Sequence, residues 1–279
     1  MLDSKTLHEK ILYPVVRIRA GKAGGSGVLI YSQPDSQKTG KFINIILTCE
    51  HVVDSNIIVK EDWDAVLKKD RKKDFFEEIT VEIFDYDGSK VISGNATQGD
   101  IIAYDKRHDL TAVQLHNFRP MPFVATIIPK IDIENLKVFD PCWTSGCSLL
   151  HSPFSNPGTL TFLREIIEQK TYIMANAPSI FGNSGGGLFH GENGHLLGLT
   201  SRVTALELGF GVDIMTWMQF STHPDRLYEF FKEQELQFLY DPADNYYEAL
   251  ARREKRQKDA LRSLLLETEK LDPLLKPHK

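Results

Sequence analysis

Short runs of alternating apolar and polar residues recur through most of the chain before residue 222. A period of two predicts a β-strand with one buried face, and a short apolar run predicts a strand buried on both faces. Such runs lie at residues 11–20, 28–31, 42–48, 79–86, 90–102, 110–115, 158–163, 171–174, 196–203 and 211–215. Turns rich in Gly, Pro and Asn separate them. Many short strands at close spacing predict a mainly β domain, either a barrel or a sandwich.

The pattern becomes helical near both ends of the chain. We expect a short helix over residues 4–10 and another over 223–231, which has Pro224 in its first turn. Residues 246–271 are rich in Ala, Arg, Glu, Lys and Leu and contain no Gly or Pro, so they predict a long amphipathic helix. We therefore expect a β domain over residues 1–222 and a helical C-terminal extension over 223–279. The long helix either packs on its own domain, contacts another copy or a partner protein, or frays.

A highly charged stretch over residues 60–78 interrupts the strand pattern. Trp63, Val66 and Leu67 lie near helical spacing within it. We expect a helical or irregular insertion there, either a solvated surface element or a regulatory one.

Composition narrows the function classes. The 279 residues are 42% hydrophobic and 25% charged, which is ordinary for a globular protein, and the net charge of −5 argues against nucleic acid as the main partner. No apolar run is long enough to cross a bilayer, and the first residues lack the apolar core of a signal peptide. Cys49, Cys142 and Cys147 are odd in number, scattered and without zinc spacing. We expect a cytoplasmic protein with buried free cysteines and with no membrane partner, metal or cofactor.

Residues 181–189 place a serine, Ser184, inside a glycine-rich turn between apolar residues. Glycine permits backbone angles that other residues resist, so such a turn can present a serine at an exposed corner beside free backbone N–H groups. A nucleophilic serine and its oxyanion hole need this arrangement. The alternative is a tight hairpin turn without catalytic chemistry.

Two further residues complete a constellation with this serine. His51 follows the apolar strand at residues 42–48, and Asp109 directly precedes the strand at 110–115. The chain order His, Asp, Ser is one of the known orders of a catalytic triad. Strand ends of a rigid barrel can aim side chains into one cleft. Taken singly, each residue is equally well explained as a surface, capping or turn residue.

These segments resemble the chymotrypsin-fold serine peptidases, and within them the HtrA-like and bacterial or viral trypsin-like group. The similar segments are residues 25–30 (Gly-Ser-Gly strand opening), 47–53 (LT-x-x-HVV), 109–113 (DLAV), 143–147 (the xxGxP strand), 182–186 (GNSGG) and 197–201 (the strand that follows). The resemblance covers about residues 15–220. It implies a double six-stranded antiparallel β-barrel with the active site between the barrels.

The resemblance also implies roles for the site residues. Ser184 would attack the scissile carbonyl, His51 would transfer the proton, and Asp109 would orient and stabilise the imidazole. The turn formed by Gly182, Asn183 and Ser184 would supply the oxyanion hole, with the N–H groups of Gly182 and Ser184 as donors.

The chain departs from the family pattern near these residues. Asn176, Phe181 and Gly187 replace an Asp and two prolines around the serine, and Cys49 and Glu50 replace a small or polar pair before the histidine. An Ile-Val-Gly-Gly activation site is absent near the N-terminus, so we expect an enzyme made in competent form. We expect no PDZ-like module in residues 221–279, because this segment is short and helical in pattern.

Specificity depends on the walls of the substrate pocket. By resemblance the walls come from residues 178–181, 200–202 and 209–212, with Asp213 close by. The residues singled out are Pro178, Phe181, Thr200, Ser201, Arg202, Gly211 and Asp213. Pro178 stands where trypsin has the Asp that binds Arg or Lys, and small apolar walls favour a small or medium apolar residue before the cleaved bond. Asp213 near the pocket floor would instead favour a basic residue, and Arg202 an acidic one.

The leading hypothesis is a serine endopeptidase that hydrolyses peptide bonds in protein or peptide substrates through an acyl-enzyme intermediate. The first alternative is a protease-fold protein used for binding or assembly, with the C-terminal helix as contact element for a homo-oligomer or a partner protein. The second is self-processing, in which the chain cuts its own tail or a fused partner.

Overall fold

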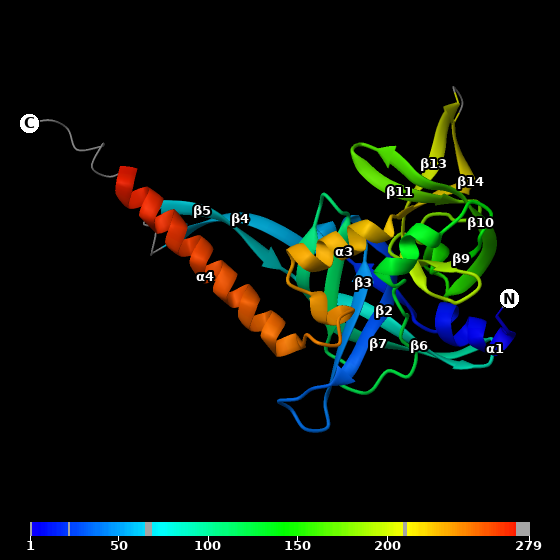
Figure 1. Cartoon of the computed structure of the whole chain (residues 1–279), viewed down its shortest axis with the longest axis horizontal. Coiled ribbons are helices and arrows are strands. Elements are labelled where there is room, and N and C mark those ends of the chain that lie inside the picture. The colour runs from blue at the N-terminus through cyan, green and yellow to red at the C-terminus, as the bar shows by residue number, and fades with distance from the viewer. Residues whose placement is uncertain (1, 22, 65–68, 209–210, 272–279) are drawn as a thin grey trace, which may run out of the picture. The chain divides into compact units, whose positions relative to one another are not determined.

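Two closed six-stranded antiparallel barrels form the body of the protein (Figure 1). The computed structural model describes residues 2–21, 23–64, 69–208 and 211–271. The N-terminal barrel contains β1 (Val15–Ala20), β2 (Ala23–Pro34), β3 (Phe42–Thr48), β6 (Ile79–Asp87), β7 (Lys90–Asp105) and β8 (Leu110–Leu115), in the order β1-β2-β3-β8-β7-β6. The C-terminal barrel contains β9 (Pro141–Gly146), β10 (Phe154–Ile167), β11 (Lys170–Ala175), β12 (Gly187–His190), β13 (Leu196–Leu208) and β14 (Gly211–Thr222), in the order β10-β11-β14-β13-β12-β9. The predicted double barrel is confirmed.

The centre of the N-terminal barrel brings two distant parts of the sequence together. β3 and β8 are almost fully buried, as their predominantly apolar composition predicts. They pair antiparallel, with Ile46 opposite Val113 and Thr48 opposite Thr111. The end of β3 therefore lies beside the start of β8. This register places the segment that carries His51 next to the one that carries Asp109.

The serine turn is held at the edge of the C-terminal barrel. β12 follows the turn directly and pairs with both β9 and β13, and Leu188 and Phe189 on β12 are fully buried. The turn also bonds β13, because Gly185 N–H donates to the Thr200 carbonyl and Thr200 N–H donates to the Gly186 carbonyl, both at 2.8 Å. Packing of β12 thus fixes where Ser184 emerges.

Contacts divide the chain into two compact units. The first consists of Met1–Asn56 and Phe76–Phe230 and holds both barrels. The second consists of Ile57–Phe75 and Phe231–Lys279 and draws on two separate stretches of sequence. α3 begins in the first unit and ends in the second.

The helices and helical turns are short, except for one near the C-terminus. Their bounds are α1 (Ser4–Leu7), η1 (His8–Leu12), α2 (Glu50–Val53), η2 (Asp54–Asn56), η3 (Lys130–Asn135), η4 (Ser148–Leu150), α3 (Pro224–Glu233), η5 (Gln237–Leu239) and α4 (Tyr246–Leu271). The long helix has the predicted bounds, and α3 extends two residues past its prediction. Within the described part of the chain, no helix is both long and apolar enough to span a bilayer.

The charged insertion is a β-hairpin, so the expectation of a helical or irregular insertion over residues 60–78 is wrong. β4 (Ile57–Asp64) and β5 (Lys69–Phe76) pair as a separate two-stranded sheet. β-Branched and aromatic side chains such as Ile57, Trp63 and Phe75 fit a pleated surface better than a helix. Val66 and Leu67 lie outside the described residues.

Candidate active site

His51 and Asp109 are in direct contact where β3 ends and β8 begins. His51 lies in the one-turn helix α2, just after β3. Its Nδ1 is 2.9 Å from Asp109 Oδ1 and 3.0 Å from Oδ2, and its backbone N–H donates to Oδ1 at 3.2 Å. The carboxylate therefore fixes both the ring and the backbone of the histidine.

Asp109 is a buried carboxylate whose negative charge is well supported. It is 8% exposed, and Ser201 Oγ on β13 donates to its Oδ2 at 2.6 Å. Burial acts to raise the pKa of Asp109, but the hydrogen bond and charge of His51, together with the Ser201 hydroxyl, outweigh burial and lower it. The backbone of Asp109 is left-handed, with φ of 54°, which is uncommon for a residue other than glycine. The surrounding contacts hold this unfavourable conformation in place.

The same contact sets the protonation chemistry of His51. Burial acts to lower its pKa, but the hydrogen bond and charge of Asp109 outweigh burial, so the pKa of His51 lies above its ordinary value. Because Nδ1 donates its proton to Asp109, the neutral ring keeps Nε2 free as an acceptor. This is the tautomer that a general base needs.

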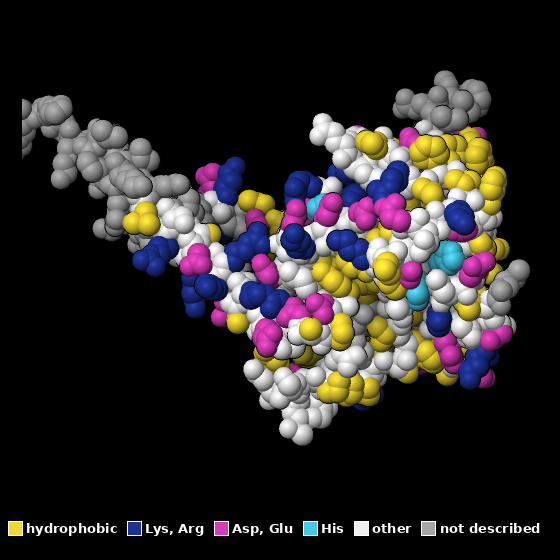
Figure 2. All heavy atoms as spheres, in the orientation of Figure 1, with side chains coloured by type: hydrophobic (Ala, Val, Ile, Leu, Met, Phe, Trp, Pro, Cys, Tyr) yellow, Lys and Arg dark blue, Asp and Glu magenta, His cyan; other side chains and the backbone are white. Residues whose placement is uncertain are grey.

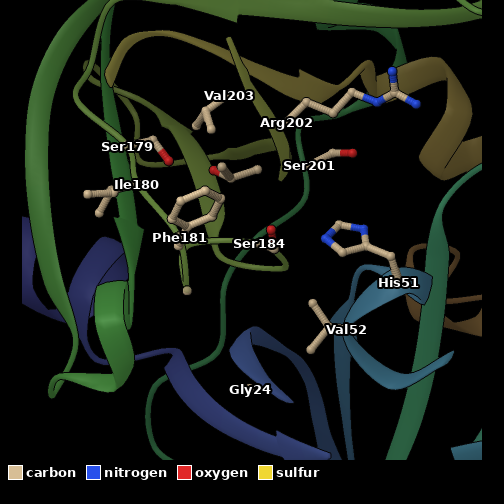
Figure 3. Close-up of a pocket in the computed structure, with 12 residues that line it drawn as sticks. Gly24, His51, Val52, Ser179, Ile180, Phe181, Ser184, Ser201, Arg202 and Val203 are labelled. Carbon is tan, nitrogen blue, oxygen red and sulfur yellow. The ribbon is translucent and has the colours of Figure 1, made fainter. Parts of the chain in front are cut away.

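Ser184 faces this imidazole across a shared cavity. Figure 3 shows the hydroxyl of Ser184 pointing towards the edge of the His51 ring that lies away from its own side-chain stem. Both residues line a cavity of about 490 Å³. Among the described residues the Ser184 hydroxyl makes no hydrogen bond. Catalytic hydrogen bonds of this kind often tighten only in the complex with substrate.

Two glycines give the serine turn its shape. Gly182 and Gly185 have φ of 93° and 82°, in the left-handed region that favours glycine. A Cβ on Gly182 would lie 2.7 Å from the Leu149 nitrogen, and a Cβ on Gly185 would collide with the Ser26 carbonyl oxygen. The glycines are therefore required by both backbone angle and space.

The turn presents two backbone N–H groups without protein acceptors. The Phe181 carbonyl accepts a hydrogen bond from Leu149 N–H, and the Asn183 carbonyl accepts one from Gly186 N–H, both at 2.8 Å. In a trans peptide the N–H points opposite to the carbonyl, so these bonds turn the N–H groups of Gly182 and Ser184 the other way. Neither N–H has an acceptor among the described residues. An oxyanion hole needs such a pair of free donors.

Asn183 supports the turn but offers no donor to the cavity. Its backbone N–H donates to the Ile180 carbonyl at 3.1 Å. Its side chain is 2% exposed, accepts from Ser148 Oγ at 2.6 Å and donates to Ser179 Oγ at 3.2 Å. Of the three residues predicted for the oxyanion hole, Gly182 and Ser184 thus supply free N–H groups. The partners that hold the Asn183 side-chain amide are thus two uncharged hydroxyls, those of Ser148 and Ser179.

Four of the seven predicted pocket residues line the cavity, namely Phe181, Thr200, Ser201 and Arg202. Ser179 and Ile180, which lie within the predicted wall segment 178–181, line it as well, and so does Val203, which lies outside the predicted segments. Arg202 is engaged by Glu168, with Nη2 2.5 Å from Oε2, and its guanidinium stacks 5.6 Å from the centre of the Tyr172 ring.

The other three predicted residues lie outside the cavity lining. The Pro178 carbonyl accepts from Asn156 Nδ2 at 2.9 Å. Gly211 pairs with Leu208, and the exposed Asp213 pairs with Leu206, far along the β13–β14 hairpin. The β13–β14 hairpin is longer than expected and contains two register shifts. Gly211 and Asp213 therefore do not lie at the positions inferred by resemblance. The expectation that Asp213 lies near the pocket floor is corrected accordingly.

Comparison with known proteins agrees with this geometry. Residues 25–199 match the family model of the trypsin-like peptidase domain. The chain belongs to the trypsin-like peptidase family. A solved HtrA-type protease with a tripeptide is similar to this peptidase in fold, with a TM-score of 0.58 and 16% identity, over 85% of this chain and 64% of that one. This chain therefore spans less than two thirds of that protein, and the likeness shows the fold. No curated protein matches the peptidase.

Metal binding does not fit the cluster around His51. Cys49, His51 and Asp109 approach closely enough to share an ion. However, Cys49 is fully buried, and burial followed by the charge of Asp109 raises the pKa of its thiol. A protonated thiol is a poor ligand, and the imidazole nitrogen nearest the group is already bonded to the carboxylate.

Several supporting residues were missed in the sequence. Ser201 was expected only as a pocket wall, yet its hydroxyl bonds Asp109. Leu149 orients the Phe181 peptide from a left-handed backbone with φ of 51°. Ser26 and Arg226 are polar, 0% and 5% exposed, and both bond to segments that carry the site. The only available signal for Ser26 was its place in the Gly-Ser-Gly motif, and Arg226 had none.

Proposed function

We propose that this trypsin-like peptidase is a serine endopeptidase that cuts protein or peptide substrates without a cofactor. One observation carries the proposal. A serine hydroxyl, an imidazole held by a buried carboxylate and two free backbone N–H groups converge on one cavity. Each of these groups has a distinct part in acyl transfer.

The reaction follows from the positions of these groups. Ser184 Oγ attacks the scissile carbonyl while His51 Nε2 takes its proton, and Asp109 stabilises the resulting imidazolium. The N–H groups of Gly182 and Ser184 bind the oxyanion, each contributing about 3 kcal/mol in the transition state. Collapse breaks the C–N bond, and His51 returns the proton to the leaving amine. A water activated by His51 then hydrolyses the acyl-enzyme.

The cavity favours a small or medium apolar residue before the cleaved bond. Its walls include Ile180, Phe181 and Val203 with the small side chains of Ser179 and Thr200, and none of the described residues that line it carries a carboxylate. Apolar walls without a counter-charge disfavour a buried Lys or Arg. Digestion of a peptide library should give cuts mainly after Ala, Val, Leu or Met, and cuts mainly after Arg or Lys would contradict this specificity.

A fluorophosphonate probe tests the enzyme proposal directly, because it reacts with an activated serine hydroxyl. We expect labelling of the wild type and of Ser36→Ala, which removes an exposed loop serine, and none of Ser184→Ala. A folded wild type that is not labelled would contradict the proposal. Equal labelling of Ser184→Ala would show that another serine reacts. Self-processing would appear as shortening of the wild-type chain but not of Ser184→Ala.

The second candidate role is contact with another copy or with a partner protein. Residues 254–260 of α4 are exposed, and Leu266 is 51% exposed. The C-terminal barrel also exposes Phe162, Ile166 and Trp217, and Figure 2 shows hydrophobic side chains gathered near the β13–β14 end of this barrel. Sedimentation of the full chain and of a chain ending at Tyr240 tests the helix. If the full chain and the shortened chain contain the same number of copies per particle, this result would count against assembly through α4.

A further inference from the structure

One buried hydroxyl of the N-terminal barrel bonds two loops of the C-terminal barrel. Ser26 on β2 is fully buried. Its Oγ donates to the Gly182 carbonyl at 2.7 Å and accepts from Cys147 N–H at 2.7 Å. Both the donor and the acceptor capacity of the hydroxyl are therefore used across the boundary between the barrels.

The backbone of Ser26 is fixed to the same place. Its N–H donates to the Ser184 carbonyl at 2.8 Å, and its carbonyl accepts from Thr48 Oγ1 at 2.8 Å. Ser26 thus holds the carbonyls of both Gly182 and Ser184. The close approach of Gly185 to the Ser26 carbonyl leaves no room for a shift of the turn towards β2.

The peptide that Ser26 Oγ holds lies between the two oxyanion donors. Gly182 N–H belongs to the preceding peptide and Ser184 N–H to the following one. The orientation of the Gly182–Asn183 peptide therefore sets the angle between the two donors. Gly182 has φ of 93° and no Cβ, so its own backbone resists rotation weakly. Within the turn this peptide is held through its N–H, which donates from Asn183 to the Ile180 carbonyl at 3.1 Å, and the bond from Ser26 Oγ fixes its carbonyl from outside the turn.

The second bond of the hydroxyl acts on the other side of Gly182. Cys147 N–H, which donates to Ser26 Oγ, starts the segment that leads to Leu149. Leu149 N–H in turn holds the Phe181 carbonyl at 2.8 Å and so orients the Gly182 N–H. Leu149 and Leu150 have left-handed backbones with φ of 51° and 60°, a conformation that is unfavourable for residues other than glycine. An external anchor at Cys147 keeps this strained segment in position.

We infer that Ser26 is a positioning residue for the oxyanion hole, acting through the peptides on both sides of Gly182. The inference rests on the proposed function of the Ser184 cavity. Ser26 does not touch the substrate. Its loss disorders the oxyanion donors and leaves the His51–Asp109 pair intact, so it slows the chemical step more than it weakens binding.

Saturation labelling with a fluorophosphonate separates these effects, because it gives a maximal rate and a half-saturating concentration. Removing one oxyanion donor typically costs 10²–10³ in rate, and Ser26→Ala loosens rather than removes the donors, so we expect a maximal rate lowered roughly 10–100-fold. The half-saturating concentration should change less than about threefold, and the pH at half-maximal rate should stay as in the wild type.

A matched control tests whether any buried hydrogen-bond loss has the same effect. Asn44 is fully buried in the same barrel, and its Nδ2 donates to the carbonyls of Asn117 at 2.5 Å and Arg119 at 2.8 Å. Asn44→Ala removes two hydrogen bonds, as Ser26→Ala does, and should lower the melting temperature but leave the maximal rate unchanged. Ser26→Cys keeps a weak donor and acceptor and should recover part of the rate.

The outcomes separate this inference from the proposed function. A wild type that does not label would overturn the proposed function and this inference with it. A labelled wild type with Ser26→Ala at the same maximal rate would overturn the inference alone, and so would a loss confined to the half-saturating concentration. If Ser26→Ala does not fold, Ser26→Cys decides, since a wild-type rate in that variant would overturn the inference.

Discussion

Arg226 on α3 holds the turn that carries Asp109, and its removal should weaken both stability and catalysis. The side chain is 5% exposed. Its guanidinium donates to the carbonyls of Thr171 at 3.1 Å, Arg107 at 3.4 Å and His108. These bonds tie the left-handed backbone at Asp109 to β11 of the other barrel.

The expected magnitude follows from the bonds that are lost. Arg226→Met keeps the apolar stem and removes the guanidinium. A hydrogen bond to a charged group contributes about 1.5–3 kcal/mol, and the contact 4.8 Å above the Tyr172 ring adds about 1 kcal/mol. The loss of the bonds to the Thr171 and His108 carbonyls and of the ring contact destabilises the fold. Because the variant no longer buries a charge, part of this loss is offset, and about 3 kcal/mol of stability is lost in total. In a domain of this size the melting temperature should fall by roughly 6–12 °C.

Thermal unfolding by circular dichroism and fluorophosphonate labelling well below the melting temperature check this prediction. We expect labelling of Arg226→Met to be about tenfold slower, because the imidazole loses its fixed partner. Arg226→Lys keeps the charge but not the planar guanidinium, so its melting temperature and labelling rate should lie between those of the wild type and Arg226→Met. Arg164→Met removes an exposed arginine paired with Glu134 and Asp225 and should cost less than about 1 kcal/mol. A melting temperature and labelling rate of Arg226→Met within error of wild type would refute the reasoning.

Three further predictions concern the site itself. The labelling rate should fall in acid, with its half-maximal value above pH 6.5, because neutral His51 is required and the pKa of His51 is raised; a midpoint below 6.5 would contradict this. The contribution of the His51–Asp109 contact to stability has the opposite pH dependence. It is fully present below the unfolded-state pKa of His51 and is lost as pH rises through the folded-state pKa. Asp109→Asn should slow labelling by about 10⁴ at neutral pH while the fold measured by circular dichroism stays intact. Gly185→Ala should destabilise the protein or abolish labelling, since its Cβ would meet the Ser26 carbonyl, and a fully active variant would show that the turn can move.

The sequence predicts the best-packed strands well and the exposed ones poorly. β3 (Phe42–Thr48) and β8 (Leu110–Leu115) have the predicted bounds because both are predominantly apolar and bounded by polar or turn residues. β13 was expected to end at residue 203 but continues to Leu208. Its pairing with β14 shifts register between Val203 and Thr204, and its outer part lacks a strict alternation of apolar and polar residues. β9 lacked an apolar pattern because the consecutive residues Thr144 and Ser145, which point to opposite faces of the strand, are both polar and both buried. Local hydrophobicity does not reveal a polar residue that is buried by a partner strand.

The β4–β5 hairpin shows a different limit. The spacing of Trp63, Val66 and Leu67 resembles that of one helix face over one or two turns. Pairing between the strands decides the outcome, through contacts such as Lys73 Nζ with Asp62 Oδ2 at 2.9 Å and Lys60 Nζ 5.8 Å from the Phe75 ring. These contacts join residues more than ten positions apart, so a helical reading of one segment cannot anticipate them.

The same distinction separates the triad from the residues that hold it. His51, Asp109 and Ser184 each stand in a short recognisable motif, so local sequence was enough to propose them. Ser26 acts on a residue 156 positions away, and Arg226 on one 118 positions away. Neither relation leaves a local pattern, and only the closed barrels make them visible.

These long-range bonds make each barrel the support of the other barrel's catalytic groups. The proposed base, His51, and its partner Asp109 stand on the N-terminal barrel, and Asp109 and its turn are held by Ser201 of β13 and by Arg226 of α3. The serine turn stands on the C-terminal barrel and is held by Ser26 of β2. A small displacement between the barrels therefore disturbs both the base and the oxyanion hole at once. Catalytic competence and packing between the barrels should accordingly be lost together, before the secondary structure of either barrel is lost.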